Sequence, residues 1–144
     1  NIYVDPEAAQ ILFQSGAPLV VMPLDVTHKA LATRERVAAF RDMGTEVGRV
    51  AAEWADFFER FDKEKYGSQG GPLHDPTVIA YLIKPELFEG RYINVEIETQ
   101  SELTLGMTVA DWWRVTDRAP NALFVGNVDA QGFFDLLTER LATL

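Results

Sequence analysis

The sequence predicts an α/β protein in which helices cover a mostly parallel sheet. The apolar run 19–24 follows closely on a helical pattern, and its lack of alternation is typical of a strand buried on both faces. A further short strand is predicted at 121–125, directly before a helical pattern at 129–141. Between these regions, alternating apolar and polar residues predict an antiparallel hairpin within 91–113.

Helix boundaries in the first third of the chain are marked by capping residues. Asp5 as N-cap and Pro6 at the first helical position predict a helix that ends at Gly16. Thr33 is the expected N-cap of a second helix, which ends at Gly44. These signals place a helix on either side of the apolar run.

A longer helix is predicted over about 45–65. Its apolar residues recur at three- and four-residue steps, and charged residues occupy the other face. Such spacing favours a core-facing stripe over an aromatic box for a cofactor. The expected stripe consists of Val47, Val50, Ala51, Trp54, Phe57, Phe58 and Phe61. The remaining predicted elements are a helix at 75–84, strands at 91–98, 103–113 and 121–125, and a closing helix at 129–141.

Composition limits the function. The 144 residues suffice for one domain, which we expect to span 1–144, and the 47% hydrophobic and 24% charged content is that of a globular protein. A net charge of −9 argues against nucleic acid and against an anionic membrane surface as partners. The chain contains no cysteine, which excludes disulfides, a thiolate nucleophile and Cys-ligated zinc, and fits a cytoplasmic location.

The glycine-rich stretch 66–76 is the strongest candidate for chemistry. It ends in His74-Asp75-Pro76 and leads into a helix. In one interpretation Asp75 is simply an N-cap and His74 a loop residue. In the other, His74 transfers a proton near neutral pH and Asp75 binds a hard cation. Because Ca²⁺ takes about 6–8 oxygens, most ligands of such a metal would lie outside this chain.

A second candidate segment, Asp25-Val26-Thr27-His28, follows the apolar run, where sites of α/β proteins tend to form. Its spacing matches no metal or triad pattern, so Asp25 or Thr27 is expected to be a loop or capping residue. The glycines at 67–71 lack the Gly-Lys-Ser/Thr ending of a phosphate-binding loop.

Four segments, in this order, resemble a known family. They are Asn-Ile-Tyr-Val-Asp-Pro-Glu-Ala-Ala at 1–9, Pro-Leu-Asp-Val-Thr-His at 23–28, Gly-Gly-Pro-Leu-His-Asp-Pro at 70–76 and Leu-Thr-Leu-Gly-Met-Thr-Val-Ala-Asp at 103–111. Over essentially its whole length the chain is similar to the C-terminal part of an inosine-uridine preferring nucleoside hydrolase. The segment at 70–76 is the most specific of the four.

This resemblance implies an open, mostly parallel sheet flanked by helices and Ca²⁺-dependent hydrolysis of the N-glycosidic bond of ribonucleosides. It further implies that His74 assists departure of the base and that Asp75 is a Ca²⁺ ligand. Asn1 would end a ribose-binding Glu-Phe-Asn motif, and Tyr66 would line the base pocket. A role in nucleoside catabolism and in purine and pyrimidine salvage, and a dimer or tetramer of identical chains, would follow.

One part of the family pattern is missing from these residues. The Asp-x-Asp-Pro-Gly-x-Asp-Asp signature, which supplies the catalytic base and most metal carboxylates in the family, does not occur here. We therefore expect the chain to be a C-terminal fragment that binds Ca²⁺ poorly and is inactive alone. The alternative is a non-catalytic α/β scaffold or interaction domain with a degenerate site.

Overall fold

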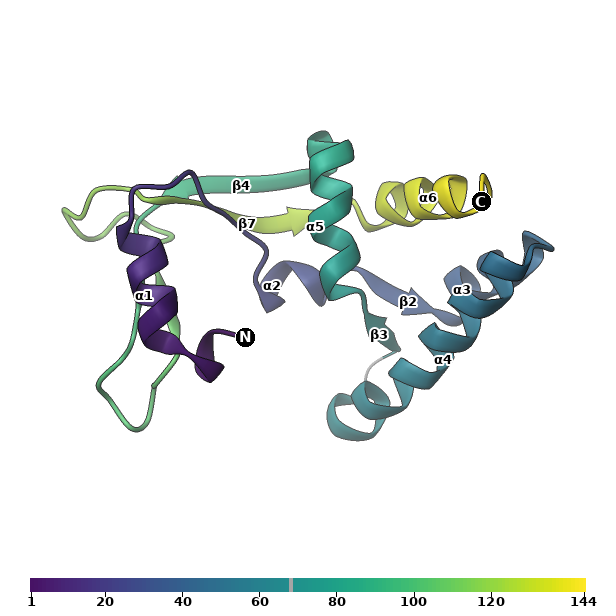
Figure 1. The fold of residues 1–144 in the computed structure, drawn as a ribbon, viewed down its shortest axis with the longest axis horizontal. Coiled ribbons are helices and arrows are strands. Elements are labelled where there is room, and N and C mark those ends of the chain that lie inside the picture. The colour runs from purple at the N-terminus through teal and green to yellow at the C-terminus, as the bar shows by residue number, and fades with distance from the viewer. Residues whose placement is uncertain (68) are drawn as a thin grey trace. The chain divides into compact units, whose positions relative to one another are not determined.

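The elements of the chain come from a computed structural model, which describes residues 1–67 and 69–144, with side chains for all of these except 61–66. The helices, including two short 3₁₀ turns, are η1 (Ile2–Val4), α1 (Pro6–Gln14), α2 (Leu24–Thr27), α3 (Arg34–Asp42), α4 (Glu46–Tyr66), α5 (His74–Ile83), η2 (Pro85–Leu87) and α6 (Ala130–Leu141). The strands are β1 (Val20–Val21), β2 (Leu31–Thr33), β3 (Gly70–Pro72), β4 (Phe88–Ile93), β5 (Val95–Ile97), β6 (Thr108–Ala110) and β7 (Ala122–Val128) (Figure 1).

Side-chain caps begin α1 and α3, as the sequence predicts. The Asp5 carboxylate accepts a hydrogen bond from the Ala8 amide (2.9 Å), and the Thr33 hydroxyl accepts one from the Arg36 amide. Each bond satisfies one of the amides that a helix start leaves without an intrahelical partner. The predicted starts of α1 and α3 are therefore confirmed.

Among the described residues the strands form three small sheets, which together with the helices confirm the α/β class. In the sheet β1-β7-β4, Val20 pairs with Leu123 in a parallel arrangement. The β5 and β6 strands pair antiparallel, with Glu96 opposite Val109, and this confirms the hairpin expected within 91–113. The third sheet pairs β2 with β3, and no strand was predicted in either segment.

Some predicted strands are longer than the observed ones. The apolar run 19–24 contributes only Val20–Val21 to the sheet. Val20 is 46% exposed in this chain, so the prediction that this strand is buried on both faces is wrong. Pro23, which has no amide hydrogen to donate, precedes α2 and ends the extended segment. Asn94 separates β4 from β5, and its amide nitrogen donates to the Ala119 carbonyl (3.0 Å).

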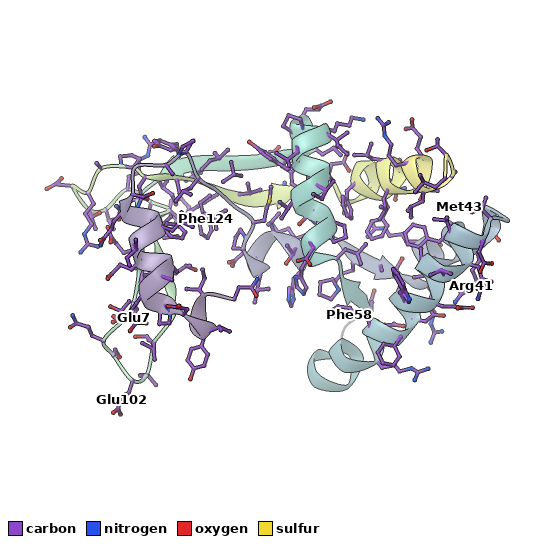
Figure 2. The ribbon with its side chains drawn as sticks, viewed as in Figure 1. Glu7, Arg41, Met43, Phe58, Glu102 and Phe124 are labelled. Carbon is purple, nitrogen blue, oxygen red and sulfur yellow. The ribbon has the colours of Figure 1, made fainter. Side chains whose placement is uncertain are left out.

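The chain divides into two compact units, and the single domain expected from the sequence stays a prediction. Unit 1 comprises residues 1–21 and 90–125. Its core forms where α1 packs against β5, and it contains Phe13, Ile93, Val95, Ile97, Ala122 and Phe124 (Figure 2).

Asn121 connects three segments of unit 1. Its amide nitrogen donates to the carbonyls of Phe13 (3.1 Å) and Val95 (2.9 Å), and its amide oxygen accepts from the Val95 amide (2.8 Å). A partly buried amide group whose donors and acceptor are all satisfied fixes the position of the segments that it joins.

The turn before β6 requires a glycine at position 106. Gly106 has φ +77, and a Cβ there would lie 2.7 Å from the Tyr3 Cα. Gly16 has a similar φ of +76 but open space around it. Substitutions at Gly16 and Gly106 therefore distinguish the cost of backbone strain from the cost of a steric contact. We expect Gly16→Ala to lower the free energy of unfolding by about 1–2 kcal/mol. Gly106→Ala should lower it by about 1–3 kcal/mol more, because the methyl group displaces the Tyr3 backbone.

Urea unfolding of the chain measures both values. Equal losses for Gly16→Ala and Gly106→Ala would contradict the contact between the turn and Tyr3.

Asp111 holds the loop that follows β6. Its carboxylate accepts hydrogen bonds from the Thr116 hydroxyl (2.7 Å) and from the amides of Thr116 and Val115, and these bonds lower the pKa of the Asp111 carboxyl below its ordinary 3.8. A carboxyl with a lowered pKa in the folded state stabilises the fold above its unfolded pKa. That contribution is lost as the pH falls through the lower folded value.

We therefore expect Asp111→Asn to lower the urea midpoint at neutral pH, with the difference from wild type shrinking below about pH 4. Asp117→Asn removes another carboxylate from the same exposed loop and controls for the general loss of charge. A difference between Asp111→Asn and wild type that is the same at every pH would exclude the proposed bonds.

Unit 2 comprises residues 22–89 and 126–144. Within it α3 and α4 lie side by side, and the β2–β3 pair packs against them (Figure 1). Among the described residues of α4, the buried ones are small: Gly48, Ala52 and Ala55. In contrast, Trp54 is 74% exposed and Phe57 is 71% exposed. The predicted core stripe of α4 is therefore wrong at Trp54, Phe57 and Phe58, and Phe61 lies outside the described side chains.

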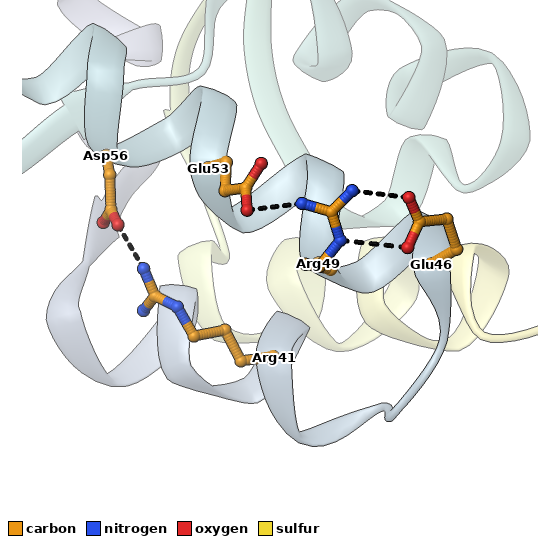
Figure 3. Close-up of polar contacts among 5 residues, drawn as sticks. All are labelled: Arg41, Glu46, Arg49, Glu53 and Asp56. Carbon is orange, nitrogen blue, oxygen red and sulfur yellow. Dashed lines mark hydrogen bonds and ion pairs between the residues drawn. The ribbon is translucent and has the colours of Figure 1, made fainter.

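The charged face of this helix pair carries ion pairs (Figure 3). Arg49 on α4 bonds to Glu46 and Glu53, one turn away on either side, and Arg41 on α3 pairs with Asp56 on α4. The bonds to Arg49 lower the pKa of the Glu46 carboxyl. All of these groups are exposed, so the pairs orient the helices and add little to stability. No helix among the described residues is long and apolar enough to cross a membrane.

Candidate active site

His74 is the first residue of α5, and β3 determines where it lies. The glycine-rich stretch forms a strand, with Ala32 opposite Gly71 and Leu31 opposite Pro72 in β2. One residue further on, the Leu73 amide donates to the Ala30 carbonyl (3.1 Å). The segment that leads to His74 is therefore held by backbone hydrogen bonds.

Two buried threonines contact His74 from different sides. The Thr27 hydroxyl, at the end of α2, lies 2.8 Å from His74 Nδ1, and its residue is 2% exposed. The Thr77 hydroxyl, one turn along α5, donates to the His74 carbonyl (2.6 Å), and its residue is 0% exposed. Thr27 thus contacts the imidazole ring, whereas Thr77 contacts the backbone of the same residue.

Aromatic rings flank the half-buried imidazole. The ring of His28 lies 5.7 Å from that of His74 between centroids, and the Phe58 ring lies 6.3 Å away in an edge-to-face arrangement. Phe58 projects from α4, as its label in Figure 2 shows. Both histidines of the chain therefore belong to one cluster, which combines α2, α4 and the start of α5.

Asp75 follows His74 in the first turn of α5 and is exposed. The N-cap of this helix is Leu73, and no described side chain caps it, so the interpretation of Asp75 as an N-cap is wrong. The helix begins at His74, one residue earlier than predicted, and β3 ends at Pro72, two residues before it. A carboxylate in the first turn of a helix is favoured by the helix dipole.

A cavity of about 470 Å³ opens beside these residues within unit 2. Apolar side chains of α4 and α6, among them Trp54, Phe58 and Leu137, form much of its wall, and His74 and Asp75 line it at the start of α5. An apolar pocket with a few polar groups is the usual form of a small-molecule site.

Of the other two predicted site residues, one belongs to unit 1 and the other has no described side chain. Asn1 is exposed and belongs to unit 1, where its carbonyl accepts from the Val4 amide (3.1 Å). The side chain of Tyr66, the last residue of α4, is outside the described residues. Thr27 and His28 were missed as partners of His74, although their position after a predicted strand was a signal for a site.

The described residues contain no group of three or more His, Asp or Glu side chains that could hold a metal ion. Asp75 provides one carboxylate, whereas Ca²⁺ takes about 6–8 oxygen ligands.

Comparison with known proteins decides the family. The family model described as inosine-uridine preferring nucleoside hydrolase matches residues 1–135. The chain belongs to this family. The resemblance seen in the four sequence segments is thus confirmed.

Relatives of this nucleoside hydrolase chain include a pyrimidine-specific ribonucleoside hydrolase, RihA, of Shigella boydii, which is 54% identical over 142 residues and matched across 98% of the chain and 46% of the relative. The purine-preferring ribonucleoside hydrolase of Gardnerella vaginalis superposes with a TM-score of 0.84 at 33% identity, covering 99% of this chain and 45% of that one. A plant nucleoside hydrolase, PpNRh1, gives a TM-score of 0.87 at 25% identity, covering 100% and 47%. The chain spans less than half the length of each relative.

Proposed function

We propose that the full-length protein containing this chain hydrolyses the N-glycosidic bond of ribonucleosides to a free base and ribose. The position of His74 is the main support: its ring is half-buried, bonded to Thr27 and flanked by His28 and Phe58 beside an apolar cavity. Membership of the nucleoside hydrolase family supports the same reaction.

His74 would act on the leaving base. When the bond between C1′ and the base nitrogen breaks, its electron pair goes to the base, which then needs a proton or a hydrogen bond. Imidazole exchanges protons near neutral pH and is suited to this role. Water forms the new bond to C1′, where positive charge develops as in other glycoside cleavage, and the proton that the water loses would go to a general base outside these residues.

Asp75 is proposed as one ligand of a Ca²⁺ ion, with the remaining ligands outside the described residues. When bound, such an ion would activate water. Asn1 is proposed to contact ribose and Tyr66 to line the base pocket, as the family resemblance implies. We also propose pyrimidine ribonucleosides among the substrates, since RihA, the more similar relative, is named pyrimidine-specific.

The second candidate is a non-catalytic scaffold or interaction domain with a degenerate site. In this case the full-length protein would fail to hydrolyse any nucleoside. We also propose a cytoplasmic location, which fits the lack of cysteine. A role in nucleoside salvage and a dimeric or tetrameric assembly are proposed from the family resemblance.

Hydrolysis by the full-length protein tests the proposal. Uridine, cytidine and inosine are incubated with the protein, and the released ribose is measured as reducing sugar. We expect ribose release to stop after metal chelation and to return with Ca²⁺, and the 144-residue chain alone to release none. No release from any of the three nucleosides by the metal-loaded protein would favour the scaffold. Tight Ca²⁺ binding by the isolated chain in calorimetry would contradict the incomplete ligand set.

A further inference from the structure

Thr27 buries a hydroxyl group against His74. Its backbone is anchored on both sides, because the Thr27 amide donates to the Pro23 carbonyl (3.1 Å) and the Thr27 carbonyl accepts from the Ala30 amide (3.0 Å). Burial leaves the hydroxyl almost no access to water, and a buried hydroxyl without a partner is costly. Its described partner is His74 Nδ1, 47 residues further along the chain.

We propose that Thr27 is a positioning residue for His74: its hydroxyl accepts a hydrogen bond from Nδ1–H, and this bond fixes the orientation and the tautomer of the ring. The catalytic role of this bond rests on the proposed function. With Nδ1 bonded to Thr27, the proton exchanged with a leaving base is carried by Nε2.

Such a bond persists through the proton transfer. In the imidazolium both ring nitrogens carry a proton, and loss of the Nε2 proton to the base leaves the Nδ1–H tautomer. The Nδ1–H group donates to Thr27 Oγ1 before and after this step. His74 therefore keeps its orientation while its charge changes from positive to neutral.

The aromatic neighbours of His74 do not favour one orientation of its ring over the other. The His28 ring is tilted by 47° to the imidazole and the Phe58 ring is in an edge-to-face arrangement with it, at centroid distances of 5.7 and 6.3 Å. Rotation of the ring by half a turn exchanges Nδ1 with a carbon and changes little in such contacts. A directional hydrogen bond to Thr27 distinguishes the two orientations.

Thr77 provides a matched control. It is as deeply buried as Thr27 and also bonds to His74, but through the backbone carbonyl. Thr77→Val and Thr27→Val each remove one buried hydroxyl near the same residue, and the replacement has nearly the same shape. Only Thr27→Val removes a bond to the ring.

The test is the tautomer of His74 in the full 144-residue chain labelled with ¹⁵N-histidine. The chain has two histidines, so long-range ¹H–¹⁵N correlation spectra contain two imidazole systems, and a His28→Asn variant assigns them. We expect neutral His74 to be mainly the Nδ1–H tautomer in wild type, Thr27→Ser and Thr77→Val. In Thr27→Val the ratio of Nδ1–H to Nε2–H should fall about fivefold or more.

Two results would overturn the inference: a wild-type His74 that is mainly the Nε2–H tautomer, or equal tautomer changes in Thr27→Val and Thr77→Val. The first needs no variant to fold. In the full-length protein we further expect Thr27→Val to lower kcat at least about tenfold with KM within about threefold, and Thr27→Ser to restore kcat. Absence of nucleoside hydrolysis by wild type would refute the proposed function, whereas the spectra alone decide the bond between Thr27 and His74.

Discussion

Replacement of His74 by alanine is expected to lower kcat for nucleoside hydrolysis by the full-length protein about 10²–10⁴-fold, the usual contribution of a positioned acid or base. The unactivated base of a nucleoside is a poor leaving group, so in the proposed role of His74 the loss of its imidazole acts on bond cleavage. KM should change much less, because the imidazole acts mainly in the transition state. Initial rates over a range of uridine concentrations measure both constants.

The choice of substrate provides the control for this variant. A riboside with an activated leaving group, such as p-nitrophenyl riboside, departs as a stable anion and needs no proton. The His74→Ala protein should therefore cleave it at a rate within about tenfold of wild type. An equal loss for uridine and for the activated riboside would show that His74 supports the fold of the site instead of the departure of the base.

Phe133→Ala is expected to lower the free energy of unfolding of the chain by about 3–5 kcal/mol, the cost of removing a large core side chain. Phe133 lies on α6, is 1% exposed and meets the Phe134 ring edge-to-face at 5.0 Å. Its truncation leaves a cavity that the surrounding helices fill only in part. Urea unfolding followed by circular dichroism gives the difference.

The matched control is Phe57→Ala, which removes the same side chain from the exposed face of α4. Because Phe57 is 71% exposed in the chain, its loss should change the free energy of unfolding by no more than about 0.5 kcal/mol. Similar losses for the two variants would mean that α6 does not bury Phe133 as described.

Local signals in the sequence were sufficient to place helices α1 and α3. The ends of these two helices are marked by residues that act through hydrogen bonds or backbone angles within a few positions: Asp5 and Gly16 for α1, and Thr33 and Gly44 for α3. The stripe of α4 could not be read in this way. Its aromatic residues have the spacing of a core face, but the helix packs through Gly48 and two alanines because small residues allow close approach to its neighbours.

In the candidate site, too, some residues could be found from local sequence and others only from the fold. His74 and Asp75 are adjacent in sequence and could be proposed from the glycine-rich segment before them. Thr27 and His28 reach His74 only because β3 pairs with β2, and that pairing joins segments about forty residues apart in the chain. No local spacing encodes such a contact, and Gly70–Pro72 carries no strand pattern of its own.

The bonds of Asn121 have a consequence for the order in which the chain folds. Its contact with Phe13 joins residues 108 positions apart, and unit 1 is assembled from two segments separated by most of unit 2. Closing so long a loop costs chain entropy before any contact repays it, which slows folding. We expect helices α3 to α5 to gain protection from hydrogen exchange early in refolding, and the amide of Val95, which bonds to Asn121, to gain it late.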